Sequence, residues 1–239
     1  MILLTEIQYN PSITYFQQVI RAEQILIEQH EHYIKQSYRN RCRILTAHGP
    51  IDLAIPVKKG NRKTKITELE IDYSQNWVNV HWRSIRSAYG SAPFFSYYSD
   101  YLQQIYEKKM TLLFELNSTL IQFYFKCLNI KKPILYTDSY VPVYPGEITD
   151  YRNKIHPKIK PDILEIIPYN QVFGKQFVSD LSIIDVLFSQ GPETLSYLAV
   201  PSAAHWTFAK IKLFLLGSLA VNTAINSLIY LLLLDINGS

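Results

Sequence analysis

The chain has 239 residues, which is enough for one sizeable domain or for one domain with an appendage. Its net charge of +4 is small for this length, so overall charge does not indicate a nucleic-acid-binding protein. The two cysteines, Cys42 and Cys127, form neither a CxxC pair nor a metal-binding spacing, which excludes a disulfide-rich scaffold. The N-terminus lacks the basic start of a signal peptide, and we expect the main body to be cytoplasmic.

The first thirty residues alternate between strand and helix signals. Residues 2–8 predict a strand, which Asn10-Pro11 ends. Ser12 is a good N-cap for a helix that continues to about Ala22, and residues 23–29 return to a strand pattern. This is a βαβ unit, so we expect the two strands to be parallel.

The remaining elements follow in the same mixed pattern. Residues 41–47 and 51–57 flank His48-Gly49-Pro50 and predict a β-hairpin. Strands are also predicted at 66–72 and 133–138. Helices are predicted at 74–90, at 110–128 and at 180–190, and a further helix begins at Pro93. Residues 140–168 predict a proline-rich loop or lid. The sequence therefore predicts an α/β fold: a mixed sheet that starts with a βαβ unit, a hairpin, and helices packed on the sheet.

Positive charge is concentrated in one part of the chain. Residues 35–65 contain nine Lys or Arg and a single acid, Asp52. Guanidinium groups bind phosphate oxygens through paired hydrogen bonds, so this pattern favours an anionic ligand. The candidate substrate-binding residues are His30, Lys35, Tyr38, Arg39, Asn40 and Arg41. The alternative is a solvated basic loop whose arginines pair with acids.

The form of the phosphate site follows from what the sequence lacks. No glycine-rich phosphate loop is present, so a phosphate would be held by side chains or by a helix N-terminus, such as the turn at 9–12. We expect Arg39 and Arg41 to be surface charges whose removal leaves the fold intact. Glu28, His30 and His32 would share one face of a strand, but nothing nearby completes a ligand set, and we expect neither a metal nor a cofactor.

Four segments resemble the WbqC-like family of bacterial proteins. They are KQSYRNRCRIL (35–45), NWVNVHWRSIRSAYGSAPFF (76–95), DYRNKIHPK (150–158) and LSIIDVLFSQGP (181–192). The resemblance covers roughly residues 3–198, and it implies a cytoplasmic role in building or modifying O-antigen, lipopolysaccharide or other surface polysaccharides. Residues 199–239 have no counterpart in the family pattern.

Candidate catalytic residues lie in two of these segments. His81 falls on the apolar stripe of its helix, where it is either a hydrogen-bonded core histidine or a general base. Asp150 and His156 share a proline-rich loop with Arg152, which is a further candidate substrate-binding residue. These three residues either position a nucleophile and stabilise its charge or simply pin the loop. Asp185 has the capping-box spacing from Ser182, which predicts a structural role. We expect the 35–43 segment, His81 and the 150–158 loop to line one cleft.

Two functions of different classes fit these residues. The first is a transferase that acts on an anionic small molecule such as a nucleotide-linked sugar, with glycosyl transfer and acyl or aminoacyl transfer both open. The second is a non-catalytic protein that docks an anionic glycan intermediate or a partner enzyme on the same basic surface. Neither involves nucleic acid.

The C-terminal end forms a separate expectation. Residues 1–198 predict one domain, and 199–239 a hydrophobic extension. Residues 213–234 carry no charge over a length that can cross a bilayer, so they predict a membrane anchor or an additional packed helix. Lys210 and Lys212 precede this run, so an inserted segment would keep the main domain on the cytoplasmic side.

Overall fold

The computed structural model describes residues 1–158 and 166–199. The chain divides into two compact units, Met1–Val200 and Pro201–Ser239, and all described residues belong to the first. Within the described ranges, no helix has both the length and the apolar character to cross a membrane. The predicted anchor or packed helix at 213–234 lies outside the described residues.

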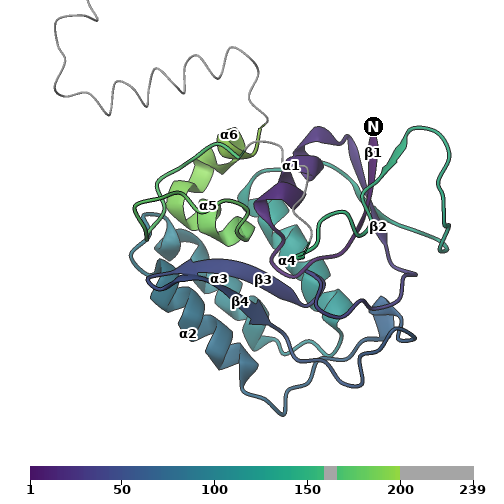
Figure 1. Ribbon diagram of the computed structural model, residues 1–239, viewed down its shortest axis with the longest axis horizontal. Helices are drawn as coiled ribbons and strands as arrows, with labels where there is room; N and C mark the ends of the chain where they lie inside the picture. The colour runs from purple at the N-terminus through teal and green to yellow at the C-terminus, as the bar shows by residue number, and fades with distance from the viewer. Residues whose placement is uncertain (159–165, 200–239) are drawn as a thin grey trace, which may run out of the picture. The chain divides into compact units, whose positions relative to one another are not determined.

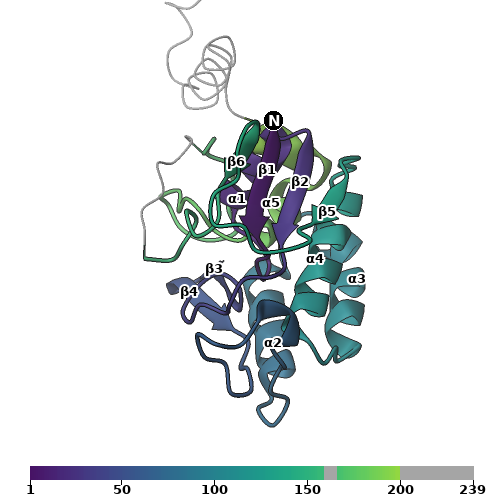
Figure 2. The ribbon, with the colours of Figure 1, turned by 90° about the vertical axis from the view of Figure 1, so that its right-hand side faces the viewer.

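A four-stranded parallel sheet organises this unit; Figure 1 labels its strands β1 and β2, and Figure 2 labels all four. Its strands are β1 (Ile2–Glu6), β2 (Gln24–Glu28), β5 (Ile134–Tyr136) and β6 (Ile148–Asp150), in the order β5-β2-β1-β6. The register pairs Glu6 with Glu28 and Leu4 with Asp150, so β1, β2 and β6 end near the same edge. Leu3, Ile25 and Ile27 are fully buried and anchor the sheet in the core.

The βαβ unit forms as predicted. Helix α1 (Ile13–Arg21) connects β1 to β2, which are parallel. The hydroxyl of Ser12 accepts a hydrogen bond from the backbone of Tyr15, as expected of an N-cap.

The hairpin and the remaining helices complete the mixed α/β fold. Strands β3 (Arg41–Thr46) and β4 (Gly49–Ala54) are antiparallel. The other elements are α2 (Trp77–Tyr89), α3 (Phe95–Glu107), α4 (Leu113–Cys127), α5 (Ile183–Gln190), α6 (Thr194–Leu198) and the 3-10 turns Ile66–Glu68 and Gly191–Glu193. The arrows of β1 and β2 point toward the part of the unit that holds the hairpin and α2 (Figure 2).

Two predicted elements differ in the structure. Residues 66–72 form a 3-10 turn followed by isolated bridges from Glu70 to Leu112 and from Ile71 to Val57, and not a strand. The alternating pattern there places Ile66, Leu69 and Ile71 in the core without a continuous ladder. The loop predicted at 140–168 contains β6, whose three residues are too few to give a periodic signal.

Candidate functional site

The carboxyl edge of the sheet gathers polar side chains from all four strands. Glu6 and Glu28 are the last residues of β1 and β2, Asp150 is the last of β6, and Thr137 directly follows β5. The chain runs from β1 to β2 to β5 on one side and then returns to place β6 on the other side of β1. In parallel α/β sheets, ligands bind at this edge, where the connections diverge.

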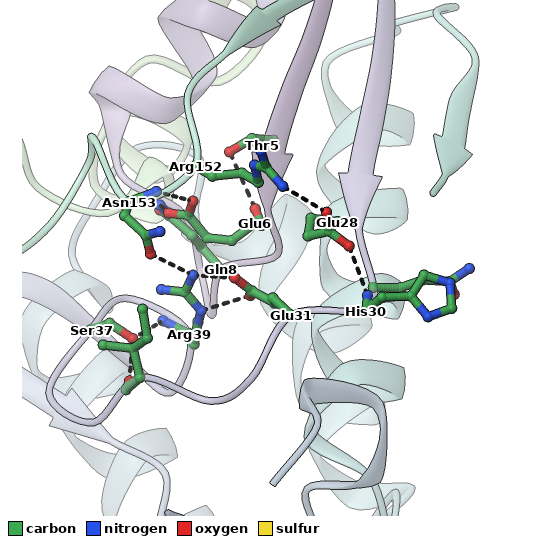
Figure 3. A network of polar contacts seen from close by, with 12 residues as sticks. Thr5, Glu6, Gln8, Glu28, His30, Glu31, Ser37, Arg39, Arg152 and Asn153 are labelled. Atoms are coloured by element: carbon green, nitrogen blue, oxygen red, sulfur yellow. Dashed lines mark hydrogen bonds and ion pairs between the residues drawn. The ribbon is translucent and has the colours of Figure 1, made fainter. Parts of the chain in front are cut away.

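A buried ion pair lies beside this edge. The Arg39 side chain is 1% exposed, and its Nε donates to Glu31 Oε1 over 2.7 Å while a second guanidinium nitrogen bonds the other carboxylate oxygen. The same nitrogen donates to Asn153 Oδ1 over 2.8 Å (Figure 3). Arg39 thus ties the 31–39 segment to the loop after β6.

Arg152 forms a second clamp. Its guanidinium contacts both carboxylate oxygens of Asp150, and Nη1 donates to Glu28 Oε2 over 3.0 Å. The rings of Tyr140 and Tyr144 lie 5.0 and 5.4 Å from its central carbon, close enough for cation–π attraction. Arg152 therefore fixes the 140–153 segment over the end of β2.

Glu6 completes the set through neutral partners. Its Oε2 accepts from the backbone of Asn153 and its Oε1 from Gln8 Nε2, each over 2.8 Å. We call the following residues the edge network: Glu6, Glu28, Glu31, Arg39, Asp150 and Arg152. It holds four carboxylates and two guanidinium groups, so it is short of positive charge when all six are ionised.

Burial governs the pKa of Glu31. Burial raises the pKa of its carboxyl to about 7, against the lowering effect of Arg39 and with a further rise from Glu6 and Glu28. A carboxyl that titrates near neutral pH beside a cavity is a common feature of functional sites.

The network borders a cavity of about 540 Å³, which we call the edge cavity. It is lined by His30, Glu31, His32, Tyr33, Ile34, Arg62, Tyr140, Arg152 and Asn153. Arg62 belongs to the exposed basic loop 58–65, which carries Lys58, Lys59, Arg62, Lys63 and Lys65. Hydrogen bonds from the backbone of Tyr33 to Thr64 and of Ile66 to Glu31 hold this loop beside the cavity.

The predicted anion-binding residues lie in different environments. Arg39 is buried in an ion pair, so the expectation of a removable surface charge is wrong for it, because eight residues of loop bring Glu31 back onto its guanidinium. Arg41 is partly exposed and lies 3.8 Å from Asp52, and Lys35 is exposed. Asn40 is buried and donates to the carbonyl of Ile55.

Tyr38 and His30 are held by the fold as well. The Tyr38 side chain is buried. His30 lines the edge cavity, and its Nε2 bonds the carbonyl oxygen of Thr137 over 2.9 Å. Within the described ranges no three His, Cys, Asp or Glu side chains are arranged to hold a metal ion.

The structure brings together two of the three segments expected to share a cleft. Arg39 of the 35–43 segment meets Asn153 of the 150–158 loop. His81 instead lines a different hollow of about 310 Å³ with Trp77 and Val80. Its Nδ1 bonds the hydroxyl of Tyr9 over 2.8 Å, and burial lowers the pKa of His81 to about 4.

The 150–158 loop contributes unequally to the edge. Asp150 and Arg152 belong to the edge network, and Arg152 lines the cavity. His156 is half-buried, and its pKa is lowered by burial and by the charge of Arg39. Its Nδ1 accepts a hydrogen bond from the backbone of Lys158.

The contacts of residues 180–185 correct two predictions: the phosphate site at the N-terminus of α1 and the capping box of Asp185. The backbone N–H groups of Ile13 and Thr14 donate to Leu181 and Asp180, so the N-terminus of α1 is not free to hold a phosphate. The Asp185 carboxylate does not close a capping box; it accepts from Tyr169 over 2.5 Å. Its role in the described structure is nevertheless to join packed segments.

Sequence reasoning missed Glu31, Glu6 and Arg62 as site residues. Glu31 stands between two histidines with no periodic or motif signal, and its partner is eight residues away. Glu6 is the end of a strand that reads as structural. Arg62 did belong to the basic stretch at 35–65, and that excess of charge was the available signal.

Comparison with known proteins places this geometry in a family. A model described as the WbqC-like protein family matches residues 7–156, which is more than half of the chain. The chain belongs to the WbqC-like family. The range matched in this WbqC-like chain includes every residue that lines the edge cavity. The predicted resemblance is thereby confirmed.

One curated relative supports the same placement. It is the "Uncharacterized protein Rv1507c" of Mycobacterium tuberculosis, which is 26% identical over 225 residues, covering 82% of this chain and 96% of the relative. No solved structure matches the chain significantly.

Proposed function

We propose that this WbqC-like protein is a transferase of bacterial surface-polysaccharide biosynthesis, including O-antigen, and that it binds a nucleotide-linked sugar in the edge cavity. The observation that carries the proposal is the cavity itself: about 540 Å³ at the carboxyl edge of a parallel sheet, with Arg62 and tyrosines in its wall. Small-molecule sites favour this edge and this mixture of aromatic and convergent polar groups.

The ligand's phosphates are assigned to the basic loop. Arg62 is exposed and lines the cavity, with Lys59 and Lys63 exposed on the same loop. A guanidinium can bind two phosphate oxygens at once, and the lysines add charge without fixed geometry. Arg39, which the sequence suggested for this role, instead holds the cavity wall in place through Glu31 and Asn153.

The sugar is assigned to the inner part of the cavity. Tyr33 and Tyr140 offer aromatic surface, and the carboxylate of Glu31 offers acceptors to sugar hydroxyl groups. Asp150 and His156 remain proposed catalytic groups on the loop that Arg39 and Arg152 anchor. His81 lines another hollow and is not part of the proposal.

A thermal-shift titration with UDP-, GDP- and dTDP-glucose tests this function. A ligand at about 100 times its Kd stabilises the folded state by about 2.7 kcal/mol, which is readily measured. Arg62→Ala should weaken binding roughly tenfold or more, because a charged hydrogen bond to phosphate is lost.

Arg83→Ala is the matched control, since Arg83 is an exposed arginine on α2 that does not line the edge cavity. It should bind as the parent does. The proposal fails if none of the three nucleotide sugars shifts the melting temperature, or if Arg62→Ala binds as well as Arg83→Ala.

A further inference from the structure

The edge cavity has two electrically different ends. Its exposed end carries Arg62 and the neighbouring lysines of the basic loop. Its inner wall carries Glu31, which is only 5% exposed and belongs to the edge network. A ligand that fits both ends has negative charge at one end and a hydrogen-bond donor, preferably a cation, at the other.

The edge network, which shares Glu31 and Arg152 with the cavity lining, has fewer guanidinium groups than carboxylates. Arg39 and Arg152 face four carboxylates in the edge network. Each Glu31 oxygen accepts a hydrogen bond from Arg39 and keeps a second lone pair for a ligand. Burial is the main cause of the raised pKa of Glu31, and the carboxylates of Glu6 and Glu28 raise it further.

We propose that the sugar bound in the edge cavity carries a primary amine, with its ammonium group recognised by Glu31 and its phosphates by the basic loop. The inference rests on the proposed function and names its substrate class: a nucleotide-linked amino sugar. An ammonium group has three donors and a full positive charge, so it matches the free acceptors and the missing charge better than a hydroxyl does.

The test compares matched sugars on the unchanged protein. Isothermal titration calorimetry measures the affinities of glucosamine 1-phosphate and glucose 1-phosphate, and of their UDP-linked forms. The amine-bearing member of each pair should bind roughly tenfold to a hundredfold more tightly, as for a hydrogen bond to a charged group. UDP-N-acetylglucosamine, whose nitrogen is uncharged, should lose that advantage.

Two variants locate the effect. Glu31→Gln keeps the shape of the side chain and should abolish the preference for the amine, whereas Glu107→Gln, on α3 and outside the edge cavity, should keep it. Arg62→Ala should weaken both sugars of a pair equally. Because the comparison of sugars uses the parent protein, it stands even if Glu31→Gln does not fold.

The outcomes separate the two proposals. Equal affinity for amine and hydroxyl sugars, or a preference that persists in a folded Glu31→Gln, overturns the inference and leaves the proposed function standing. Failure of every nucleotide sugar and sugar phosphate to bind overturns the proposed function and the inference with it.

Discussion

Two buried polar clusters in this protein differ in charge and in surroundings. The edge network is ionic and borders the edge cavity. The second cluster, which we call the interior cluster, is built from buried neutral groups: Tyr9, Asn10, His81, Tyr106 and Tyr124. One of its members, His81, also lines the smaller hollow of about 310 Å³. Both are extensively hydrogen-bonded, so hydrogen bonding alone does not distinguish a site from a structural network.

The side chains of the interior cluster form one continuous chain of hydrogen bonds. Tyr9 contacts His81 over 2.8 Å and Tyr106 over 2.9 Å, and Asn10 joins Tyr106 to Tyr124. Burial raises the pKa of the tyrosines and lowers that of His81, so each group stays neutral. The edge network instead keeps charges in a buried place at a cost in solvation. The proposed function rests on this difference, which is the charge retained beside the edge cavity.

The largest effect is expected from breaking the buried ion pair. Arg39→Met removes the cation that faces Glu31, and the carboxylate left behind should destabilise the fold by about 3–5 kcal/mol. Urea unfolding of the variant and of Arg83→Ala, expected within about 0.5 kcal/mol of the parent, measures this. A further Glu31→Leu change removes the stranded charge and should restore part of the loss. If Arg39→Met unfolds like the parent, the pair contributes nothing to the edge network.

The two clusters should respond to pH with opposite sign. His81 has a folded pKa of about 4, below its usual 6.5. Its contribution to the free energy of unfolding is therefore fully present above pH 6.5 and is lost as the pH falls toward 4. Glu31 has a folded pKa of about 7, above its usual 4.5. Its contribution to the free energy of unfolding is therefore fully present below pH 4.5 and is lost as the pH rises toward 7. Each effect amounts to about 3 kcal/mol at 1.36 kcal/mol per pKa unit.

Variants separate these two contributions. The stability advantage of the parent over His81→Gln should shrink as the pH falls from 6.5 to 4. The advantage of the parent over Glu31→Gln should grow as the pH falls from 7 to 4.5. Chemical unfolding at intervals across this range measures both differences. Parallel trends for the two variants would contradict the assignment of a neutral histidine and a repelled carboxylate.

A smaller loss is expected within the interior cluster. Tyr124→Phe removes the hydroxyl that donates to Asn10 Oδ1 over 2.6 Å and leaves a buried acceptor unpaired. Such a loss costs about 1–3 kcal/mol. Urea unfolding should show it, while binding of UDP-glucose by the folded variant stays at the parent's value. A selective loss of binding without a loss of stability would move the site toward the interior.

The smallest effect is expected from the hairpin. Arg43 donates to Asp52 over 2.9 Å, but both side chains are more than a third exposed. Exposed pairs contribute about 0.2–1 kcal/mol, so Arg43→Ala should change the unfolding free energy by no more than this. The measurement is urea unfolding at two salt concentrations, since high salt should reduce even this small difference. A loss of several kcal/mol would show that the pair is structurally essential.

Elements with a strong local sequence pattern could be predicted from the sequence alone. The first βαβ unit follows from short-range periodicity and from Ser12, whose side chain caps α1 as expected. Strand β6 could not be predicted, because three residues give no period and its partner β1 lies far away in the sequence.

The site was less predictable because it depends on burial. The basic stretch at 35–65 correctly indicated unusual charge, but not that Arg39 would be buried and Arg62 exposed. Only the fold brings Glu31 beneath Arg39 and places the end of β6 next to Glu6. His81 lay on the apolar stripe of α2, and both of its possible roles fit the sequence equally until its neighbours were known.

The most direct test of the central claim is a crystal structure of the protein with UDP-glucosamine. The account predicts that the molecule lies in the edge cavity, with phosphate oxygens within hydrogen-bonding distance of Arg62 and the sugar amine within reach of Glu31. Binding in the hollow beside His81, or in the edge cavity with the amine directed away from the carboxylates toward solvent, would contradict it.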